Sequence, residues 1–142
     1  MDLVTLDFET FYSKEYSLSK LTTEEYIRDY RFEAIGVATK INDGKAKWFA
    51  NYSGAIVHHF AEVDWGNTIL VAHNAMFDAA ILSWRYGVKP KIIADTLSMS
   101  RAIDGVNAKH SLKNCSERYG IGVKGTEVLS ALGKQLRDFS EE

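Results

Sequence analysis

The run Thr68–Ala72 constrains the fold more than any other segment of the chain. It is short and continuously apolar, as is typical of a strand that is buried on both faces. Apolar residues at helical spacing follow from Phe77 to Trp84, and Gly87 with Pro90 predicts the end of that helix. A strand that is covered on both faces and leads directly into a helix is typical of α/β proteins. We therefore expect a sheet with helices packed on it.

The remaining elements complete one mixed sheet. The turn Asn42–Gly44 joins two strands that should be antiparallel neighbours. The other expected strands and helices follow from apolar patterns and from capping residues. The strands are expected over Leu3–Leu6, Phe32–Thr39, Lys45–Phe49 and Lys91–Ala94, and the helices near Thr22, from Ser53, from Ser111 and over Thr126–Leu136. This order predicts a single α/β domain, residues 1–142, whose mixed sheet has about five strands, one of them antiparallel.

The composition excludes several classes of protein. With 46% hydrophobic and 25% charged residues, the chain is expected to be globular. No apolar run approaches the roughly 20 residues that span a bilayer, so we expect no membrane contact. Met1 is followed by neither a basic segment nor a cleavable apolar one, and the single Cys115 can form no internal disulfide. These features are typical of a cytoplasmic protein, which for a phage-encoded chain means the bacterial host cell.

The net charge of −2 argues mildly against a module that only binds nucleic acid through phosphate contacts, because such modules are usually basic. It does not argue against a metal-dependent nuclease. Such an enzyme needs clustered carboxylates, and the cations that it binds reverse the local field.

Asp7 and Glu9 follow the apolar run Leu3–Leu6. Side chains two residues apart in a strand point to the same side, so the two carboxylates should face together. They repel each other unless a proton or a cation lies between them. Oxygen-only ligands favour Mg²⁺ or Mn²⁺ over zinc. The alternative is that D-x-E is a common pattern of solvated surface residues.

A second polar cluster, His73–Asp78, follows the buried run Thr68–Ala72. Asp78 would lie in the first turn of the following helix, facing the place where the two strand ends converge. Asn74 could form a hydrogen bond across the strand–helix junction. The alternative is an ordinary Asn/Asp helix cap with Phe77 in the core. Two strands that each end in carboxylates are a more specific signal than either one alone.

These two clusters resemble the first two motifs of the proofreading 3′→5′ exonucleases, which have a ribonuclease H-like fold and a D-E-D-D metal set. Leu6–Thr10 resembles the first motif, and His73–Asp78 resembles the second, N-x-x-F-D. The segment between them, and the segment from Ala94 to Gly120, resemble the exonuclease domain of phage-type family A DNA polymerases. The resemblance covers nearly the whole chain.

The resemblance implies a site and a reaction. Asp7, Glu9 and Asp78 would hold two Mg²⁺ or Mn²⁺ ions that clamp the attacking and leaving oxygens. The substrate would be the 3′ end of single-stranded DNA, and a covalently linked polymerase domain would be the partner in replication. Phe8, Thr10 and Phe11 could line the pocket for the terminal nucleotide, although packing explains Phe8 equally well. Asn74 and Phe77 would shape the site without binding metal.

The family's third motif, Y-x-x-x-D or H-x-x-x-x-D, supplies the fourth carboxylate and the residue that positions the water. Asp138 has Lys134 four residues before it and Gly133 five before it, so it does not match. His59–Asp64 and His73–Asp78 have the second spacing but lie too early in the chain. We therefore expect a truncated exonuclease domain that lacks its third motif and is weakly active or inactive.

Three alternatives remain open from the sequence. The chain could be a stand-alone ribonuclease H-like nuclease that acts on RNA or short oligonucleotides. It could be a catalytically dead exonuclease-like domain that still binds nucleic acid. It could be a different carboxylate enzyme such as a glycosidase, but three carboxylates at adjoining strand ends and the N-x-x-F-D motif argue against this.

Overall fold

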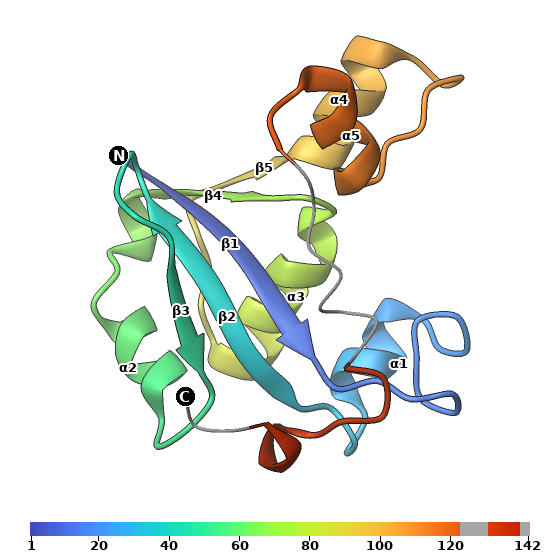
Figure 1. Cartoon of the computed structure of the whole chain (residues 1–142). Coiled ribbons are helices and arrows are strands. Elements are labelled where there is room, and N and C mark those ends of the chain that lie inside the picture. Colours follow the sequence, from blue (N-terminus) through green and yellow to red (C-terminus); the bar gives the residue numbers. More distant parts are fainter. Residues whose placement is uncertain (123–130, 140–142) are drawn as a thin grey trace.

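The computed structural model describes residues 1–122 and 131–139. Its centre is a five-stranded sheet in the order β3-β2-β1-β4-β5 (Figure 1). The strands are β1 (Asp2–Thr10), β2 (Ala34–Ile41), β3 (Lys47–Ala50), β4 (Thr68–Ala72) and β5 (Ile92–Asp95). β1, β4 and β5 run parallel, whereas β2 is antiparallel to both β1 and β3. The predicted α/β fold with one antiparallel strand is confirmed.

The helices begin and end at residues with clear local causes. They are α1 (Thr23–Arg28), α2 (Ala55–Ala61), α3 (Ala75–Tyr86), α4 (Thr96–Asp104) and α5 (Leu112–Tyr119), with 3₁₀ turns η1 (Trp65–Asn67) and η2 (Leu136–Asp138). Thr22 and Glu25 form a reciprocal capping box at α1. Ser111 caps α5 through the backbone N–H of Asn114, and Gly87 ends α3 in the left-handed conformation. Local sequence therefore determines most of the helix ends.

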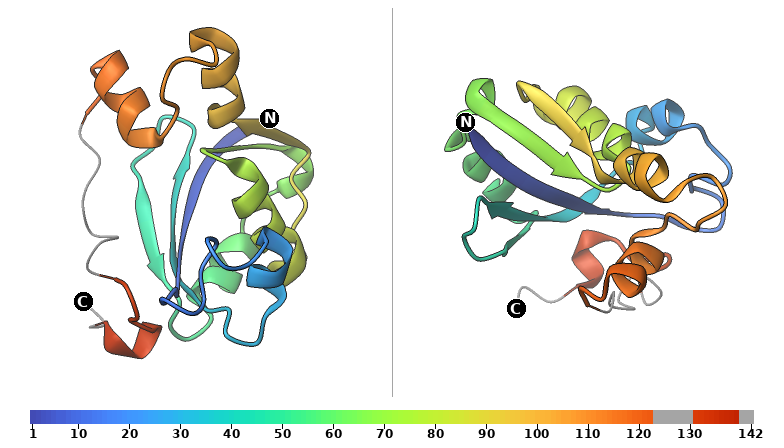
Figure 2. Two further views of the ribbon diagram at one scale, coloured as in Figure 1. Left: turned by 90° about the vertical axis from the view of Figure 1, so that its right-hand side faces the viewer. Right: turned by 90° about the horizontal axis from the view of Figure 1, so that it is seen from above.

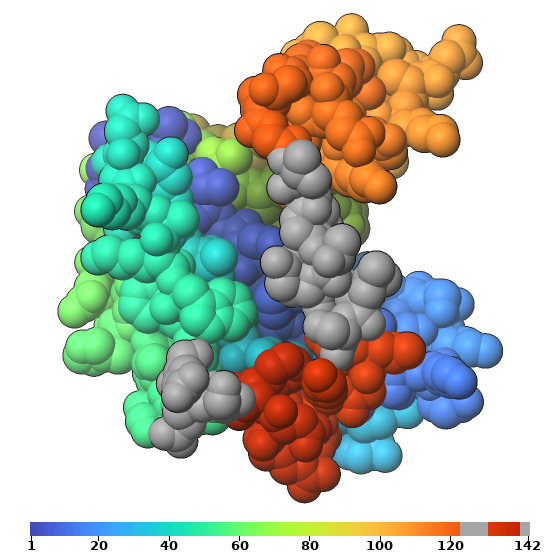
Figure 3. Space-filling model, viewed as in Figure 1, coloured from blue at the N-terminus to red at the C-terminus, as the bar shows by residue number. Residues whose placement is uncertain are grey.

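The two faces of the sheet differ. In β1, Val4, Leu6 and Phe8 are buried, whereas the alternate residues Leu3 and Asp7 are exposed. The buried residues face α1, α2 and α3, which lie together on one side of the sheet (Figure 2). The opposite face carries Asp7 and Glu9, and we call it the carboxylate face. Figure 3 views the molecule from this side, with residues 131–139 bordering the lower end.

Aromatic rings fill the core between the sheet and the helices. Phe8 stacks on Tyr86 with 5.8 Å between ring centroids, and Phe60 meets both rings edge-on. Tyr16 stacks on Tyr26 at 4.5 Å. The loop after β1, expected to be irregular, is thereby anchored to α1. This packing holds the end of β1 firmly against α3.

The described residues near the carboxyl end differ from the expected helix over Thr126–Leu136. Residues 126–130 lie outside the described part of the chain. Residues 131–135 are not helical, and one 3₁₀ turn follows at Leu136–Asp138. Tertiary hydrogen bonds hold this segment: Gly133 N–H donates to the Tyr12 carbonyl, and the Tyr52 hydroxyl donates to the carbonyls of Leu136 and Phe139. For residues 131–135 the helix prediction was wrong, because contacts with distant segments replace local helical bonds.

None of the helices in the described ranges is both long enough and apolar enough to cross a membrane.

Candidate functional site

The last residues of β1 have a strand neighbour on one side only. On the β2 side, Asp7 pairs with Ala38 and Glu9 pairs with Gly36. On the β4 side, the parallel pairing stops at Thr5 and Val71. Because β4 turns away into α3 at this point, the backbone of β1 beyond Thr5 faces the first turn of that helix. The strand end therefore meets the helix that carries Asp78.

Asp78 lies beside β1 at the position where β4 no longer pairs with it. It lies in the first turn of α3, is 3% exposed, and its Oδ1 accepts the backbone N–H of Phe8 at 3.1 Å. Phe8 lies between Asp7 and Glu9, so this bond joins the Asp78 carboxylate to the backbone that carries the other two. The sharp turn before α3 is made by Asn74, whose φ of 66° is left-handed. The backbone therefore brings Asp78 next to the strand end that carries Asp7 and Glu9.

The environment of Asp78 raises its pKa. Burial is the largest cause, and the negative charges of Asp7 and Glu9 add to it. The hydrogen bond from the Phe8 N–H acts in the opposite direction but does not compensate, and the pKa of Asp78 rises to about 7. A carboxyl group with this pKa is protonated in acid and becomes charged near neutrality. The charges of Asp7 and Glu9 thus contribute to the raised pKa of Asp78, and a cation bound nearby would lower that pKa.

The donor set fits a hard divalent cation. All three side chains offer oxygen ligands, the ligands that Mg²⁺ and Mn²⁺ prefer. Asp7 is exposed and Glu9 is half-buried, so an ion could reach them from solvent. Within residues 1–122 and 131–139, however, no three His, Cys, Asp or Glu side chains are already arranged to hold a metal ion. Binding of a cation by all three carboxylates would therefore require a rearrangement of these side chains.

The residues predicted to contact substrate differ in their access. Phe8 is 5% exposed and packs in the core on the helix-covered face, because the strand period turns it inward; this is the packing role that the sequence left open as the alternative. Thr10 pairs its hydroxyl with that of Tyr26 at 2.7 Å. Phe11 is half-buried against Tyr16, close enough to the strand end to touch a bound ligand.

Asn74 and Phe77, the two residues expected to shape the site, are held by a backbone bond and by packing. The backbone N–H of Asn74 donates to Asp95 Oδ1 at 2.9 Å, which ties the β4–α3 turn to the end of β5. The Asn74 side chain makes no capping bond to α3. Phe77 is half-buried and its ring lies 5.9 Å from Tyr26. The main chain of Asn74 thus bonds to the neighbouring strand β5.

The histidines are structural groups. His73 Nδ1 lies 2.9 Å from the Thr96 hydroxyl, and its Nε2 donates to the His110 carbonyl at 2.7 Å. His110 in turn bonds Ser100 and the Gly105 carbonyl. These bonds fasten α4 and α5 to the end of β4. His73 and Asp78 share H-x-x-x-x-D spacing, but they serve separate parts of the fold, as the sequence predicted.

Comparison with known proteins gives a partial relationship in sequence. No family model matches the chain. The DNA polymerase III PolC-type of Staphylococcus saprophyticus is 36% identical over 61 residues, which are 39% of this chain and 4% of the relative. The PolC-type polymerase of Staphylococcus aureus is 36% identical over 64 residues, 41% of this chain and 4% of the relative. The chain thus spans a small fraction of these polymerases.

Solved structures extend the relationship to nearly the whole chain. Trypanosoma brucei RNase D in complex with RNA U12 superposes with a TM-score of 0.69 at 16% identity, over 99% of this chain and 47% of that one. Brucella melitensis NrnC with bound Mg²⁺ gives 0.60 at 20% identity, over 96% and 63%. A nuclease in its apo form gives 0.64 at 20% identity, over the same shares. The chain therefore has a ribonuclease H-like, exonuclease-type fold.

Proposed function

We propose that this chain is a metal-dependent 3′→5′ exonuclease domain that removes terminal nucleotides from single-stranded DNA and proofreads for a covalently linked DNA polymerase. The observation that carries the proposal is the coupling of Asp7, Glu9 and Asp78 at the adjoining ends of β1 and α3. The local similarity to PolC-type polymerases supports the polymerase context. The more specific assignment to the phage-type family A polymerases remains a prediction from the two motifs.

Each residue of the site has a proposed role. Asp7, Glu9 and Asp78 would hold Mg²⁺ or Mn²⁺. When bound, a pair of such ions supplies the charge that activates a water and stabilises the leaving 3′-oxygen. Asp78 must be ionised to act as a ligand, and the Phe8 N–H keeps its Oδ1 fixed while the other oxygen can turn toward the ion. Asp7, which is exposed, is the carboxylate that a substrate phosphate meets first.

We propose further that the 142-residue chain hydrolyses DNA slowly by itself. Its sequence has no Y-x-x-x-D, and its H-x-x-x-x-D matches precede the position of the third motif. The fourth carboxylate and the group that positions the water are then absent. General-base positioning contributes about 10²- to 10⁴-fold to a hydrolytic rate, so the loss should be large. Turnover at the rate of a complete exonuclease domain would contradict this part of the proposal.

The test is hydrolysis of a 5′-labelled single-stranded DNA with Mg²⁺ or Mn²⁺. We expect a slow ladder of products shortened from the 3′ end. Asp7→Asn should abolish it, whereas Asp43→Asn, in the exposed β2–β3 turn, should leave it unchanged. Products shortened from the 5′ end, or equal rates for both variants, would contradict the proposal. Carboxylate-dependent metal binding without any hydrolysis would indicate the catalytically dead domain.

A second candidate is a nuclease that acts on RNA or very short oligonucleotides. The superposition on RNase D in complex with RNA U12, and on NrnC bound to pGG at a TM-score of 0.60, favours it. The same assay with an RNA of identical sequence and with a dinucleotide separates the candidates. Preference for DNA of ten or more nucleotides supports proofreading, and preference for RNA or dinucleotides supports the second candidate.

A further inference from the structure

A row of small residues on β2 separates the carboxylates from an exposed tryptophan on β3. Asp7 pairs with Ala38, and Ala38 pairs with Trp48 on the other side of β2. In the next row, Glu9 pairs with Gly36. Residues in cross-strand register point to the same face of a sheet, so Trp48 lies on the carboxylate face. Neighbouring strands are about 4.8 Å apart, which puts the Trp48 backbone about 10 Å from that of Asp7.

The indole ring of Trp48 leans toward Glu9. A Cβ atom built on Gly36 would lie 2.2 Å from the Cζ2 atom and 2.5 Å from the Cη2 atom of this ring, so the ring crosses directly over the glycine. Since Gly36 pairs with Glu9, the ring lies over the β2 residue next to Glu9 in the sheet. Trp48 is nevertheless 51% exposed. Glycine at position 36 is what allows the ring to lie so low over the sheet.

Phe49, the residue that follows Trp48 in β3, has a structural role. Phe49 points to the helix-covered face and stacks on His59, with 3.9 Å between ring centroids. Trp48 stacks on no aromatic ring within residues 1–122 and 131–139, and much of its surface faces solvent. Adjacent residues of β3 thus divide their roles between packing in the core and presenting an open ring.

We propose that Trp48 is a stacking platform for a nucleobase of the single-stranded DNA whose 3′ end is bound at Asp7 and Glu9. This inference rests on the proposed function and adds a substrate-binding residue to it. An exposed indole stacks on any base, and the small residues Gly36 and Ala38 leave space between the ring and the carboxylates. The nucleotide chain would cross β2 at this point.

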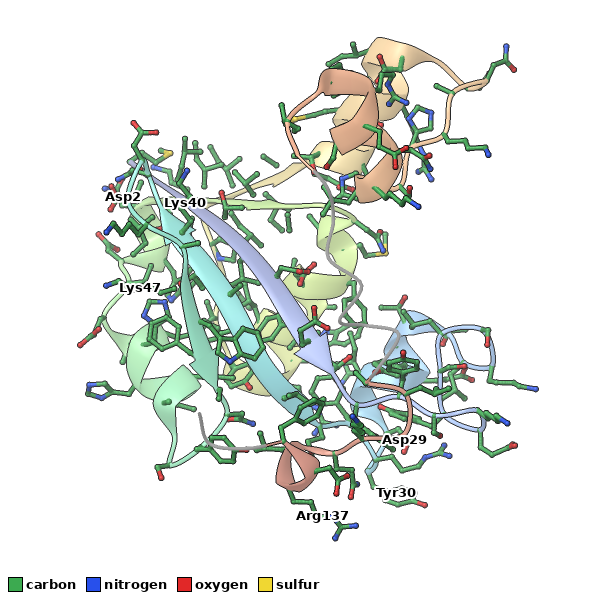
Figure 4. All side chains as sticks on the ribbon, in the orientation of Figure 1. Asp2, Asp29, Tyr30, Lys40, Lys47 and Arg137 are labelled. Carbon is green, nitrogen blue, oxygen red and sulfur yellow. The ribbon has the colours of Figure 1, made fainter. Side chains whose placement is uncertain are left out.

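Besides Asp7 and Glu9, this face carries a lysine that could contact a phosphate. Lys40 is exposed and pairs with Thr5, in the row next to Asp7 and Trp48, so it belongs to the same face. It lies toward the end of the sheet at which β1 begins, near Asp2 (Figure 4). The Trp48 ring leans toward Gly36 and so away from Lys40, whose ammonium group could neutralise a phosphate of another nucleotide while the ring contacts a base. Trp48 and Lys40 together offer both kinds of contact.

The experiment measures binding to the full chain, in Mg²⁺, of a fluorescein-labelled single-stranded DNA whose 3′-terminal linkages are phosphorothioates, so that hydrolysis is slowed. We expect Trp48→Ala to weaken binding about 5- to 150-fold. Trp48→Phe should retain part of the affinity. The matched control is Trp84→Ala, since Trp84 is 40% exposed but lies on α3, on the helix-covered side of the sheet. It should bind like the unaltered chain.

An abasic scan identifies the contact itself. DNAs with one abasic site at each of the last positions before the 3′ end are compared on the unaltered chain and on Trp48→Ala. We expect one position at which removing the base weakens binding to the unaltered chain but has no effect on the variant. Fluorescence of Trp48 in a Trp65→Phe, Trp84→Phe background should be quenched by every DNA except that one. This second measurement needs no substitution of Trp48, so it tests the contact even if Trp48→Ala fails to fold.

The outcomes separate this inference from the proposed function. The unaltered chain could hydrolyse DNA while Trp48→Ala binds DNA equally well and Trp48 fluorescence does not change. This result would contradict the stacking role of Trp48 but not the proposed nuclease activity. If the unaltered chain neither binds nor hydrolyses DNA, the proposed function fails, and the platform with it. A Trp48 dependence that is confined to RNA of the same sequence would overturn the assignment to DNA.

Discussion

Two aspartates, Asp78 and Asp95, lie near strand–helix junctions, and the fold shifts their pKa values in opposite directions. Asp95 ends β5 and caps α4. Burial by itself raises the pKa of Asp95, but hydrogen bonds from the backbone N–H groups of Ala75, Leu97 and Asn74 and from the Ser98 hydroxyl outweigh it and lower the pKa. Asp78 accepts a backbone bond from Phe8 but is more deeply buried, beside two negative charges, and its pKa rises to about 7.

The difference shows how the same residue type serves two purposes. The carboxylate of Asp95 accepts several hydrogen bonds, as a structural helix cap does. Ionisation of Asp78 costs free energy, because the carboxylate is buried beside two negative charges. A cation bound next to it would offset this cost. A perturbed carboxyl group beside others is a candidate for function with a stated physical cause, whereas a satisfied one is not. Three measurements test this contrast.

The largest expected effect is on stability. Asp78→Asn keeps an oxygen that can accept the Phe8 N–H but removes the charge. Because the folded pKa of Asp78 is about 7 and the ordinary value is 3.8, the folded state binds this proton more tightly, and the stability that this provides is lost as pH rises from about 4 to about 7. At pH 8 the variant should therefore be more stable than the unaltered chain without metal, by up to about 4 kcal/mol. Urea unfolding at pH 8 and pH 4 measures it, and an equal gain at both values would contradict the pKa of Asp78.

The next effect is on metal affinity. A divalent ion must displace the proton of Asp78, so its affinity should fall as the carboxyl group becomes protonated. With a pKa of about 7, we expect Mn²⁺ binding to weaken about tenfold, or about 1.4 kcal/mol, between pH 8 and pH 6. Calorimetric titration measures this. Asp95→Asn should show the same pH dependence as the unaltered chain, and loss of the dependence in that variant would mean that Asp78 is not the titrating group.

The smallest expected effect is on the stability contributed by Asp95 as a helix cap. Asp95→Ala should destabilise the fold by about 1 kcal/mol, since a helix cap and the bond to Asn74 are lost. The lowered pKa of Asp95 means that its contribution is present above the ordinary value and is lost as pH falls through the lower, folded value. Thermal unfolding at pH 7 measures the loss. A destabilisation that disappears at pH 7 and grows in acid would reverse the assignment.

Much of the fold follows from local patterns in the sequence. The buried run Thr68–Ala72, the turn Asn42–Gly44 and the caps at Thr22 and Ser111 were predicted correctly, because each depends on residues within a few positions of one another. The shared face of Asp7 and Glu9 follows from the period of two along a strand. By the same period, Phe8, which lies between these two residues, points into the core.

Other features depend on residues that are distant in the sequence. The bond from Phe8 to Asp78, and the burial that raises the pKa of Asp78, both arise where β1 continues beyond its pairing with β4. The position of the Trp48 ring over the β2 residue next to Glu9 requires the register of three strands and a glycine beneath the ring. Gly133 is bonded to Tyr12, and Leu136 and Phe139 are bonded to Tyr52. No local pattern contains these relations.

The sequence by itself determined which carboxylates are available and on which elements they lie, because strand and helix periods are set by neighbouring residues. Only the tertiary structure decided that Asp78 is buried against two other charges and that Trp48, unlike Phe8, presents its ring on the same face as those charges. Burial and charge coupling depend on the packing of several elements at once, and their energies arise only when the sheet and α3 come together.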